Sequence, residues 1–234
     1  MQEKITAIVL AAGRGTRMGS AVKKQYMDLK GKPLLYYSLK AFEESEVDTI
    51  VLVTDSSDID YCNREIVQKY GITKVCAVVP GGSERYLSVL EGLKASPPCD
   101  YVLIHDSARP FVSRSLIKNI IEGVKRYGAV LPAVPTKDTI KVVDTEGKVE
   151  ATPDRTSIYL AQTPQAFSFA GIMKANENML EHPIPGVEIT DDAMIMECYG
   201  DTPMHIIMGD YDNIKVTTPG DMPLAVAIME RGIE

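Results

Sequence analysis

Residues 5–19 read I-T-A-I-V-L-A-A-G-R-G-T-R-M-G, an apolar run that leads directly into a glycine-rich turn. A short apolar run before a turn is typical of a β-strand that is buried on both faces. Similar runs occupy residues 49–54, 74–79, 101–106 and 129–134, with helical patterns such as residues 33–44 and 113–127 between them. Strands buried on both faces form parallel sheets that helices cover on both sides. The sequence therefore predicts an α/β fold with a doubly wound, mostly parallel, Rossmann-like sheet.

The size and charge of the chain exclude several classes of protein. Its 234 residues, of which 45% are hydrophobic, suit a single domain over residues 1–234. The net charge of -7 repels polyanions, so we expect no nucleic-acid partner. No apolar run approaches the roughly 18 residues of a membrane helix, so we expect no membrane partner. The four cysteines lack C-x-x-C spacing, which speaks against a zinc cluster or a disulfide framework and favours a reducing, cytoplasmic setting.

Residues 138–152 interrupt the alternation of strands and helices. They read D-T-I-K-V-V-D-T-E-G-K-V-E-A-T, and this alternation around a Glu146-Gly147 turn predicts a β-hairpin. The hairpin has few apolar residues to bury against its own domain, and a two-stranded ribbon is only marginally stable alone. We therefore expect a protruding β-hairpin arm, at about residues 137–157, that packs on a second copy of the chain in a homodimer.

The turn after the first strand is a candidate phosphate site, because ligands of such sheets bind beyond the carboxyl ends of the strands. Glycines allow backbone N–H groups to approach an anion closely. The spacing G-x-G-x-x-x-G is one residue longer than the dinucleotide fingerprint, and no G-K-[ST] triplet follows it. Four cations lie within a short stretch here: Arg14, Arg17, Lys23 and Lys24. They favour a triphosphate ligand, against the alternative of a solvated basic loop.

A second candidate site follows the strand at residues 101–106, which runs into H-D-S-A-R-P. The carboxylate of Asp106 suits Mg²⁺, which prefers carboxylate and phosphate oxygens. The alternatives for Asp106 are a helix cap and an ion pair with Arg109. We interpret His105 as a packing or hydrogen-bonding residue rather than a catalytic one. Lys215, in D-N-I-K-V-T, either reaches the same edge of the sheet or lies with its stem along an apolar surface.

Three further segments carry weaker indications. Gly81 and Gly82 permit the close approach of a flat ligand, or simply form a tight connection in which Ser83 caps the next helix. Arg155 follows the hairpin and is solvated unless the arm enters a site. Thr218-Pro219 predicts the start of a helix near the carboxyl end.

Eight motifs, in this order, resemble those of the 2-C-methyl-D-erythritol 4-phosphate cytidylyltransferases, within the pyrimidine-nucleotidyl transferase family. They are A-A-G-R-G-T-R-M-G, K-Q-Y, G-G-S-E-R-x-x-S-V, H-D-S-A-R-P, K-D-T-I-K, P-D-R, Q-T-P-Q and D-N-I-K-V-T. The resemblance spans Ile5 to about Ile228. Ribitol-5-phosphate cytidylyltransferases share the glycine loop, the H-D-x-x-R-P box and Q-T-P-Q. Residues 138–141 and 153–155 favour methylerythritol phosphate as the acceptor.

The resemblance implies an activity. A cytidylyl group passes from CTP to 2-C-methyl-D-erythritol 4-phosphate with release of pyrophosphate, and the product is 4-diphosphocytidyl-2-C-methyl-D-erythritol of the non-mevalonate route to isoprenoids. The resemblance also implies Mg²⁺ as cofactor. Because the acceptor is already an anionic phosphate, no base is needed to make the nucleophile. The barrier lies in bringing two anions together, which requires cations around the α-phosphorus.

The resemblance further implies roles for charged residues. Arg17 and Lys24 match the pair that stabilises the transition state. Arg155 and Lys215 match the pair that positions the acceptor phosphate. Asp106 matches the acid that binds substrate and metal.

Other positions match substrate contacts. Arg109 and Thr139 are two of them, and the arm would carry Thr139 and Arg155 into the neighbouring subunit's site. The positions that match nucleotide contacts are Ala11, Ala12, Gly13, Gly15, Gly82, Ser83 and Ser88. Lys23 stands where proline often precedes K-Q, which leaves open which lysine enters the site. Ser83 stands where some members carry aspartate, which leaves the contact to the base open.

Two other interpretations differ in class from this enzyme. A non-catalytic nucleotide-binding module on the same fold would have lost its catalytic cations, yet Arg17, Lys24, Arg155 and Lys215 are all present. A nicotinamide-dependent oxidoreductase fails on the spacing of the glycine loop and on the lack of an acid near residue 35 to hold a ribose.

Overall fold

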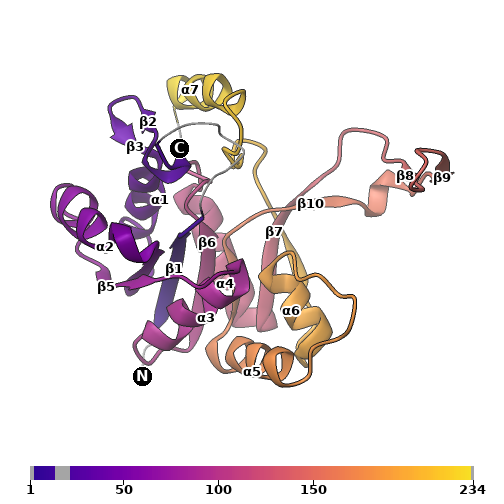
Figure 1. Cartoon of the computed structure of the whole chain (residues 1–234), viewed down its shortest axis with the longest axis horizontal. Helices are drawn as coiled ribbons and strands as arrows, with labels where there is room; N and C mark the ends of the chain where they lie inside the picture. The colour runs from indigo at the N-terminus through magenta and orange to yellow at the C-terminus, as the bar shows by residue number, and fades with distance from the viewer. Residues whose placement is uncertain (1–2, 14–21, 233–234) are drawn as a thin grey trace.

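An eight-stranded sheet forms the centre of the computed structural model, which describes residues 3–13 and 22–232 (Figure 1). Strands β5 (Val75–Pro80), β4 (Thr49–Thr54), β1 (Ile5–Ala11) and β6 (Tyr101–Asp106) lie side by side and run parallel. Beyond β6 comes the antiparallel strand β11 (Gln165–Ser168), and then β7 (Ala129–Pro135). Strand β7 also pairs with β12 (His205–Met208) and with β10 (Tyr159–Ala161). The predicted doubly wound, mostly parallel sheet is confirmed.

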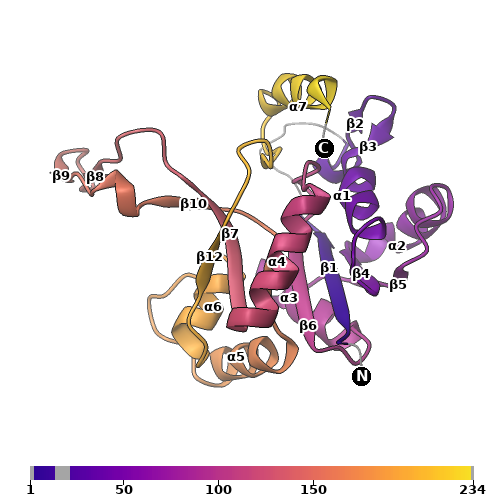
Figure 2. The same cartoon turned by 180° about the vertical axis from the view of Figure 1, so that it is seen from behind.

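Helices cover both faces of this sheet, as Figures 1 and 2 show from opposite sides. Helices α1 (Leu34–Glu43) and α4 (Arg114–Tyr127) pack on one face, and α3 (Arg85–Ala95), α5 (Phe169–Glu181) and α6 (Asp192–Tyr199) pack on the other. The alternation of side chains along β1 supplies both cores. Ala7 and Val9 pack with α1 and α4, whereas Ile8 packs with α3 and α5.

The five predicted strands are all present, three of them with the predicted bounds. Strand β5 both begins and ends one residue later than expected, and β7 ends one residue later. Both ends of helix α4 are capped. The hydroxyl of Ser113 accepts the N–H of Leu116 at 3.1 Å, and Gly128, with a φ of 80°, ends the helix.

Two predicted helix starts are wrong by one or more residues. Helix α3 has Glu84 rather than Ser83 at its N-cap, and no side chain caps it there. Helix α7 (Asp221–Arg231) begins after Gly220 rather than at Thr218-Pro219. The reason is that the carboxylate of Asp221 accepts the N–H groups of Thr217 and Thr218, each at 2.8 Å, which holds these two residues in a turn before the helix.

Two segments lie between β1 and β5 beside the main layers. The strands β2 (Asp28–Leu29) and β3 (Lys32–Pro33) form a small hairpin, and Leu29 packs there with Ala225 and Ile228 of α7. After β4, a 3₁₀ turn at Ser56–Asp58, the short helix α2 (Ile59–Tyr61) and a π-helical turn at Cys62–Gln68 follow one another.

The hairpin arm extends away from the sheet (Figure 1). Its strands β8 (Val142–Val143) and β9 (Val149–Ala151) pair antiparallel. Gly147 has a φ of 82° in the turn between them, which is the conformation that the predicted Glu146-Gly147 turn requires. A 3₁₀ turn, η5 (Arg155–Ser157), leads from the arm back to β10. The arm joins the sheet where β10 pairs with β7.

Helices capable of crossing a membrane are not found within residues 3–13 and 22–232, where none is both long and apolar enough.

Candidate active site

A cavity of about 740 Å³ opens at the carboxyl ends of the parallel strands, where the sheet topology predicts a ligand. The residues that follow four of these strands line it: 11–13 after β1, 55–56 after β4, 81–85 after β5 and 106–108 after β6. Lys24, Ser88 and Lys215 also contribute to its wall. We call this space the nucleotide cavity, after the ligand that the sequence analysis expects there.

Most of the predicted site residues meet in the nucleotide cavity. They are Ala11, Ala12, Gly13, Lys24, Gly82, Ser83, Ser88, Asp106 and Lys215. Arg17 and Gly15 lie outside the described residues. Arg109 lies in a neighbouring cavity, and Thr139 and Arg155 lie on the arm.

The loop after β5 packs closely enough to explain its glycines. A Cβ atom on Gly81 would stand 2.6 Å from the Cβ of Ala12 and 2.7 Å from the Oγ of Ser88, so a side chain has no room there. The backbone N–H of Gly82 donates to the Oγ of Ser88 at 3.1 Å. At Gly81 and Gly82 the loop therefore presents backbone to the nucleotide cavity.

The two adjacent lysines point in different directions. The ammonium group of Lys23 forms ion pairs with Asp58, at 2.7 Å, and with Asp55, at 3.4 Å. Lys24 instead lines the nucleotide cavity next to Gly13. Of the two lysines that the sequence leaves open, Lys24 is the one that the fold turns into the cavity.

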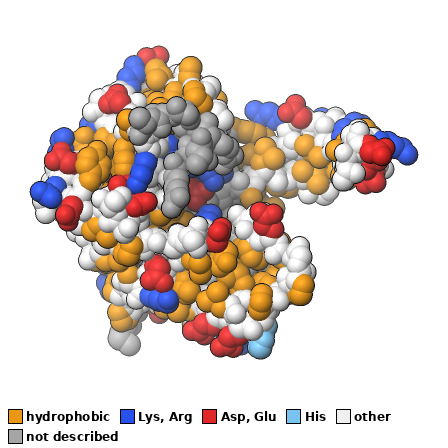
Figure 3. Space-filling view, in the orientation of Figure 1, with side chains coloured by type: hydrophobic (Ala, Val, Ile, Leu, Met, Phe, Trp, Pro, Cys, Tyr) orange, Lys and Arg blue, Asp and Glu red, His pale blue; other side chains and the backbone are white. Residues whose placement is uncertain are grey.

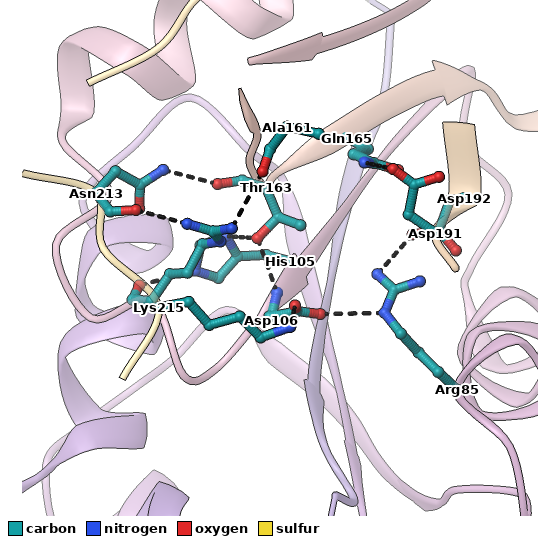
Figure 4. A network of polar contacts seen from close by, with 11 residues as sticks. Arg85, His105, Asp106, Ala161, Thr163, Gln165, Asp191, Asp192, Asn213 and Lys215 are labelled. Carbon is teal, nitrogen blue, oxygen red and sulfur yellow. Dashed lines mark hydrogen bonds and ion pairs between the residues drawn. The ribbon is translucent and has the colours of Figure 1, made fainter. Parts of the chain in front are cut away.

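Asp106 lies between two cations at the end of β6 (Figure 4). One carboxylate oxygen lies 3.3 Å from Nε of Arg85, and the other lies 2.7 Å from Nζ of Lys215. Burial alone would raise the pKa of Asp106, but the charges of Arg85 and Lys215 outweigh burial and hold this pKa below its usual range. The carboxylate is therefore ionised at neutral pH. The alternative of an ion pair with Arg109 is wrong, because Arg109 donates to the backbone carbonyls of Asn213 and Ala161.

Arg85 connects Asp106 to a buried acid that the sequence analysis did not single out. Its Nη2 lies 2.7 Å from Oδ2 of Asp192, whose side chain is completely buried at the start of α6. Burial raises the pKa of Asp192, and the neighbouring charge of Arg85 opposes that rise. Asp191 caps α6 through the N–H of Met194, at 2.9 Å. The guanidinium of Arg85 thus joins α3, α6 and β6.

A chain of hydrogen bonds behind Asp106 fixes His105 (Figure 4). The backbone N–H of Asp106 donates to Oγ1 of Thr163 at 3.1 Å, and that hydroxyl lies 3.1 Å from Nδ1 of His105. Nε2 of His105 lies 3.0 Å from the carbonyl of Arg109. Since a carbonyl only accepts, Nε2 carries the proton and Nδ1 accepts from Thr163. Burial lowers the pKa of His105 to about 4, so the ring is neutral at pH 7 and packs as expected.

A smaller cavity of about 230 Å³ adjoins the nucleotide cavity. The two cavities share Arg85, Asp106 and Lys215, and the smaller one adds Arg109, Thr163 and Thr190. We call it the acceptor cavity, after the substrate that is proposed for it below. The motif Q-T-P-Q shapes its wall: Gln162 donates to the carbonyl of Asp210 at 2.7 Å, and Gln165 donates to Asp191 at 2.8 Å.

Thr139 and Arg155 do not reach either cavity of their own chain. Both are exposed on the arm, which extends away from the sheet edge (Figure 1). The arm carries exposed apolar side chains, with Val143 51% and Val149 52% accessible. Figure 3 shows hydrophobic atoms along the arm, with charged side chains gathered toward its tip.

Comparisons with known proteins agree with this geometry. The family model described as 2-C-methyl-D-erythritol 4-phosphate cytidylyltransferase matches residues 5–231. A protein of that name from Lachnoclostridium phytofermentans is 50% identical over 227 residues, which cover 97% of both chains. One from Clostridium botulinum (strain Loch Maree / Type A3) is 44% identical over 97% of this chain and 98% of its own length.

Solved structures agree as well. The 4-diphosphocytidyl-2C-methyl-D-erythritol synthase of Anaerococcus prevotii has a TM-score of 0.85 at 34% identity, over 98% of this chain and 99% of its own. The 2-C-methyl-D-erythritol 4-phosphate cytidylyltransferase of Thermus thermophilus has a TM-score of 0.75 at 29% identity, over 95% of this chain and 98% of its own. The chain therefore belongs to the 2-C-methyl-D-erythritol 4-phosphate cytidylyltransferase family.

Proposed function

We propose that the two adjoining cavities carry out the reaction of this family. The chain transfers a cytidylyl group from CTP to 2-C-methyl-D-erythritol 4-phosphate, and pyrophosphate leaves. In our proposal CTP occupies the nucleotide cavity and the polyol phosphate occupies the acceptor cavity, within a single catalytic domain of residues 1–234. The observation that carries the proposal is the shared border: Asp106 and Lys215 line both cavities, so two substrates would meet beside them.

The chemistry that we propose needs cations rather than a base. The attacking oxygen belongs to a phosphate and is already anionic, so His105, which is buried and neutral, has no proton to remove. A positioned donor aimed at developing charge lowers a barrier by roughly 3 to 4 kcal/mol. We assign Lys24 to the α-phosphate of CTP and Lys215 to the acceptor phosphate. By family resemblance, Arg17 joins Lys24 at the α-phosphate.

The remaining predicted contacts divide between the two substrates. We propose that Ala11, Ala12, Gly13 and Gly15 hold the triphosphate through backbone N–H groups. Gly82, Ser83 and Ser88 would contact the cytosine and ribose, since they line the same cavity. Arg109 would contact the polyol from the wall of the acceptor cavity.

Mg²⁺ fits this site through one carboxylate. Asp106 is ionised and lies on the cavity wall, and Mg²⁺ commonly binds one or two carboxylates together with substrate phosphates. Within the described part of the chain, no three His, Cys, Asp or Glu side chains form a metal cluster, so the phosphates of CTP would supply the other oxygens. When bound, the ion neutralises charge on the triphosphate. Asp106 would hold the ion while Lys215 and Arg85 keep its carboxylate in place.

We also propose a homodimer in which each arm, at about residues 137–157, enters the site of the other subunit. The exposed valines of the arm support this proposal, because a second chain would bury them. Arg155 would then contact the acceptor phosphate in the partner's site, and Thr139 would contact the substrate there. The four free cysteines suit a reducing compartment, so we place the enzyme in the cytoplasm.

A pyrophosphate-release assay tests the proposed function. We expect turnover with CTP, Mg²⁺ and 2-C-methyl-D-erythritol 4-phosphate, and much slower turnover with ribitol 5-phosphate. A preference for ribitol 5-phosphate would identify the chain as a ribitol-5-phosphate cytidylyltransferase. An absence of turnover with both acceptors, together with tight CTP binding, would identify a non-catalytic nucleotide-binding module instead.

A further inference from the structure

Lys24 reaches the nucleotide cavity from a short segment whose other side chains are tied to the body of the protein. The segment consists of Lys23 and the 3₁₀ helix η2 (Lys24–Tyr26). Gln25 is buried, and its Nε2 donates to the carbonyl of Ala11 at 2.6 Å, which fastens η2 to the end of β1. This hydrogen bond fixes the position of the segment, but it does not stop the segment from rotating about the bond.

Asp58 contacts residues before and after Gln25. Its Oδ2 accepts from Nζ of Lys23 at 2.7 Å and from the hydroxyl of Tyr26 at 3.0 Å. The Tyr26 hydroxyl also lies 3.1 Å from Oγ1 of Thr54 and 3.2 Å from Sγ of the buried Cys62. One carboxylate oxygen therefore holds both ends of the four-residue segment that presents Lys24.

The backbone explains why the segment needs such a clamp. Lys23 has φ −58° and ψ 138°, and Met27, which follows η2, has φ −62° and ψ 139°. These are polyproline II angles, and an ordinary residue loses conformational entropy when it is held in them. A proline ring would fix φ at about −65° without any partner. At position 23 there is no such ring, and the ion pairs of the lysine side chain with Asp58 and Asp55 hold the backbone in this conformation instead.

We propose that Asp58 is a positioning residue for cytidylyl transfer: by binding Lys23 and Tyr26 together, it holds η2 so that the ammonium of Lys24 stays in the nucleotide cavity. The proposal rests on the role that we assign to Lys24 under the proposed function. Under this proposal, Lys23 holds the backbone in place and does not contact the substrate. Two simpler views compete with it, namely a surface ion pair without consequence and a direct contact of Lys23 with the nucleotide.

The test compares six variants by steady-state kinetics, with urea denaturation to confirm that each one folds. A small misplacement of a reacting group can cost up to about 100-fold in rate, so we expect Asp58→Asn and Lys23→Ala to lower kcat about tenfold. The KM for CTP should change much less than kcat. Tyr26→Phe, which removes one hydroxyl and keeps the ring, should lower kcat in the same direction.

The decisive variant is Lys23→Pro. Its ring imposes the φ of the native residue, so it should recover most of the kcat that Lys23→Ala loses, although it has no charge. Lys4→Ala is the matched control. Lys4 forms an ion pair with Asp48, also at 2.7 Å, but at the amino-terminal end of the parallel strands, on the side away from the cavity. Its kcat should equal that of the wild type.

The outcomes separate this proposal from the proposed function. If Lys24→Ala loses turnover while Asp58→Asn and Lys23→Ala keep it, the role of Lys24 stands and the positioning role of Asp58 is overturned. If Lys23→Pro is as slow as Lys23→Ala, the charge of Lys23 acts directly and the clamp is overturned. If Lys24→Ala itself keeps turnover, the role assigned to Lys24 fails, and the positioning proposal fails with it.

Discussion

At the scale of single residues, Asp106 organises the charges of the site. It lies at the end of β6, with Lys215 on one oxygen and Arg85 on the other, and its backbone N–H reaches Thr163. The position of Asp106 was predictable, because the residue that ends a buried parallel strand faces the ligand edge of the sheet. Its partners were not predictable, since Arg85 and Lys215 come from distant segments whose approach depends on the whole topology.

The buried His105 predicts how the free energy of unfolding depends on pH. Its pKa is about 4 in the folded chain against an ordinary 6.5, so the unfolded chain binds more protons between these values. Stability is therefore full above pH 6.5 and falls as the pH drops toward 4. From the linkage relation we expect His105 to account for a loss of about 2 kcal/mol between pH 7 and pH 5.

Urea denaturation of His105→Gln at both pH values measures this loss. The variant should show a weaker dependence of unfolding free energy on pH than the wild type. His182→Gln serves as the control, because the side chain of His182 is 79% exposed, and it should keep the wild-type dependence. An unchanged dependence in His105→Gln would show that other groups cause the loss.

At the scale of elements, the strands were easier to predict than the contacts between helices. Apolar runs with turns after them gave all five predicted strands, because burial on both faces leaves a plain signature in composition. Strands β10 and β11, which run antiparallel, were missed. Q-T-P-Q follows β10 and runs into β11 at Gln165, and its polar side chains hide the pattern of a buried strand.

The ion pair between Arg85 and Asp192 was also missed, because its partners are 107 residues apart. Neither residue has a local pattern that reveals the other. The adjacent lysines at 23 and 24 present a related difficulty. The sequence alone does not show which lysine turns toward the cavity. The carboxylate of Asp58 pairs with Lys23 and holds it away from the cavity, but Asp58 lies on a different segment.

The contact of Arg85 with Asp192 predicts a coupling between α6 and α3. Asp192→Asn removes the buried charge that balances Arg85, so we expect a loss of about 2 kcal/mol in unfolding free energy, less than for a fully buried pair because Arg85 is partly exposed. The matched control is Asp201→Asn, whose ion pair with Lys174 is exposed and should contribute less than about 0.5 kcal/mol. Equal losses in the two variants would contradict this distinction.

At the scale of the whole molecule, the proposed homodimer makes each site depend on the arm of the other subunit. Thr139 and Arg155 are exposed in the single chain, so their proposed roles require a second copy. If the arms cross between subunits, Arg155→Ala damages the partner's site and Lys24→Ala damages its own. A mixed dimer of the two variants then contains one intact site.

Complementation measures this crossing. With two tags and co-expression of the Arg155→Ala and Lys24→Ala chains, random pairing places half of the chains in mixed dimers, so we expect about a quarter of the wild-type activity. Each variant alone should remain nearly inactive. A mixture that is no more active than its components would place each arm at its own site.

The most direct test is a crystal structure of the chain with CTP and Mg²⁺ bound. We expect the triphosphate in the nucleotide cavity, with its α-phosphate next to the ammonium group of Lys24, the base against Gly82 and Ser83, and Lys215 facing the acceptor cavity. CTP bound elsewhere, or Lys24 turned into solvent while the nucleotide is in place, would contradict the site proposed for cytidylyl transfer.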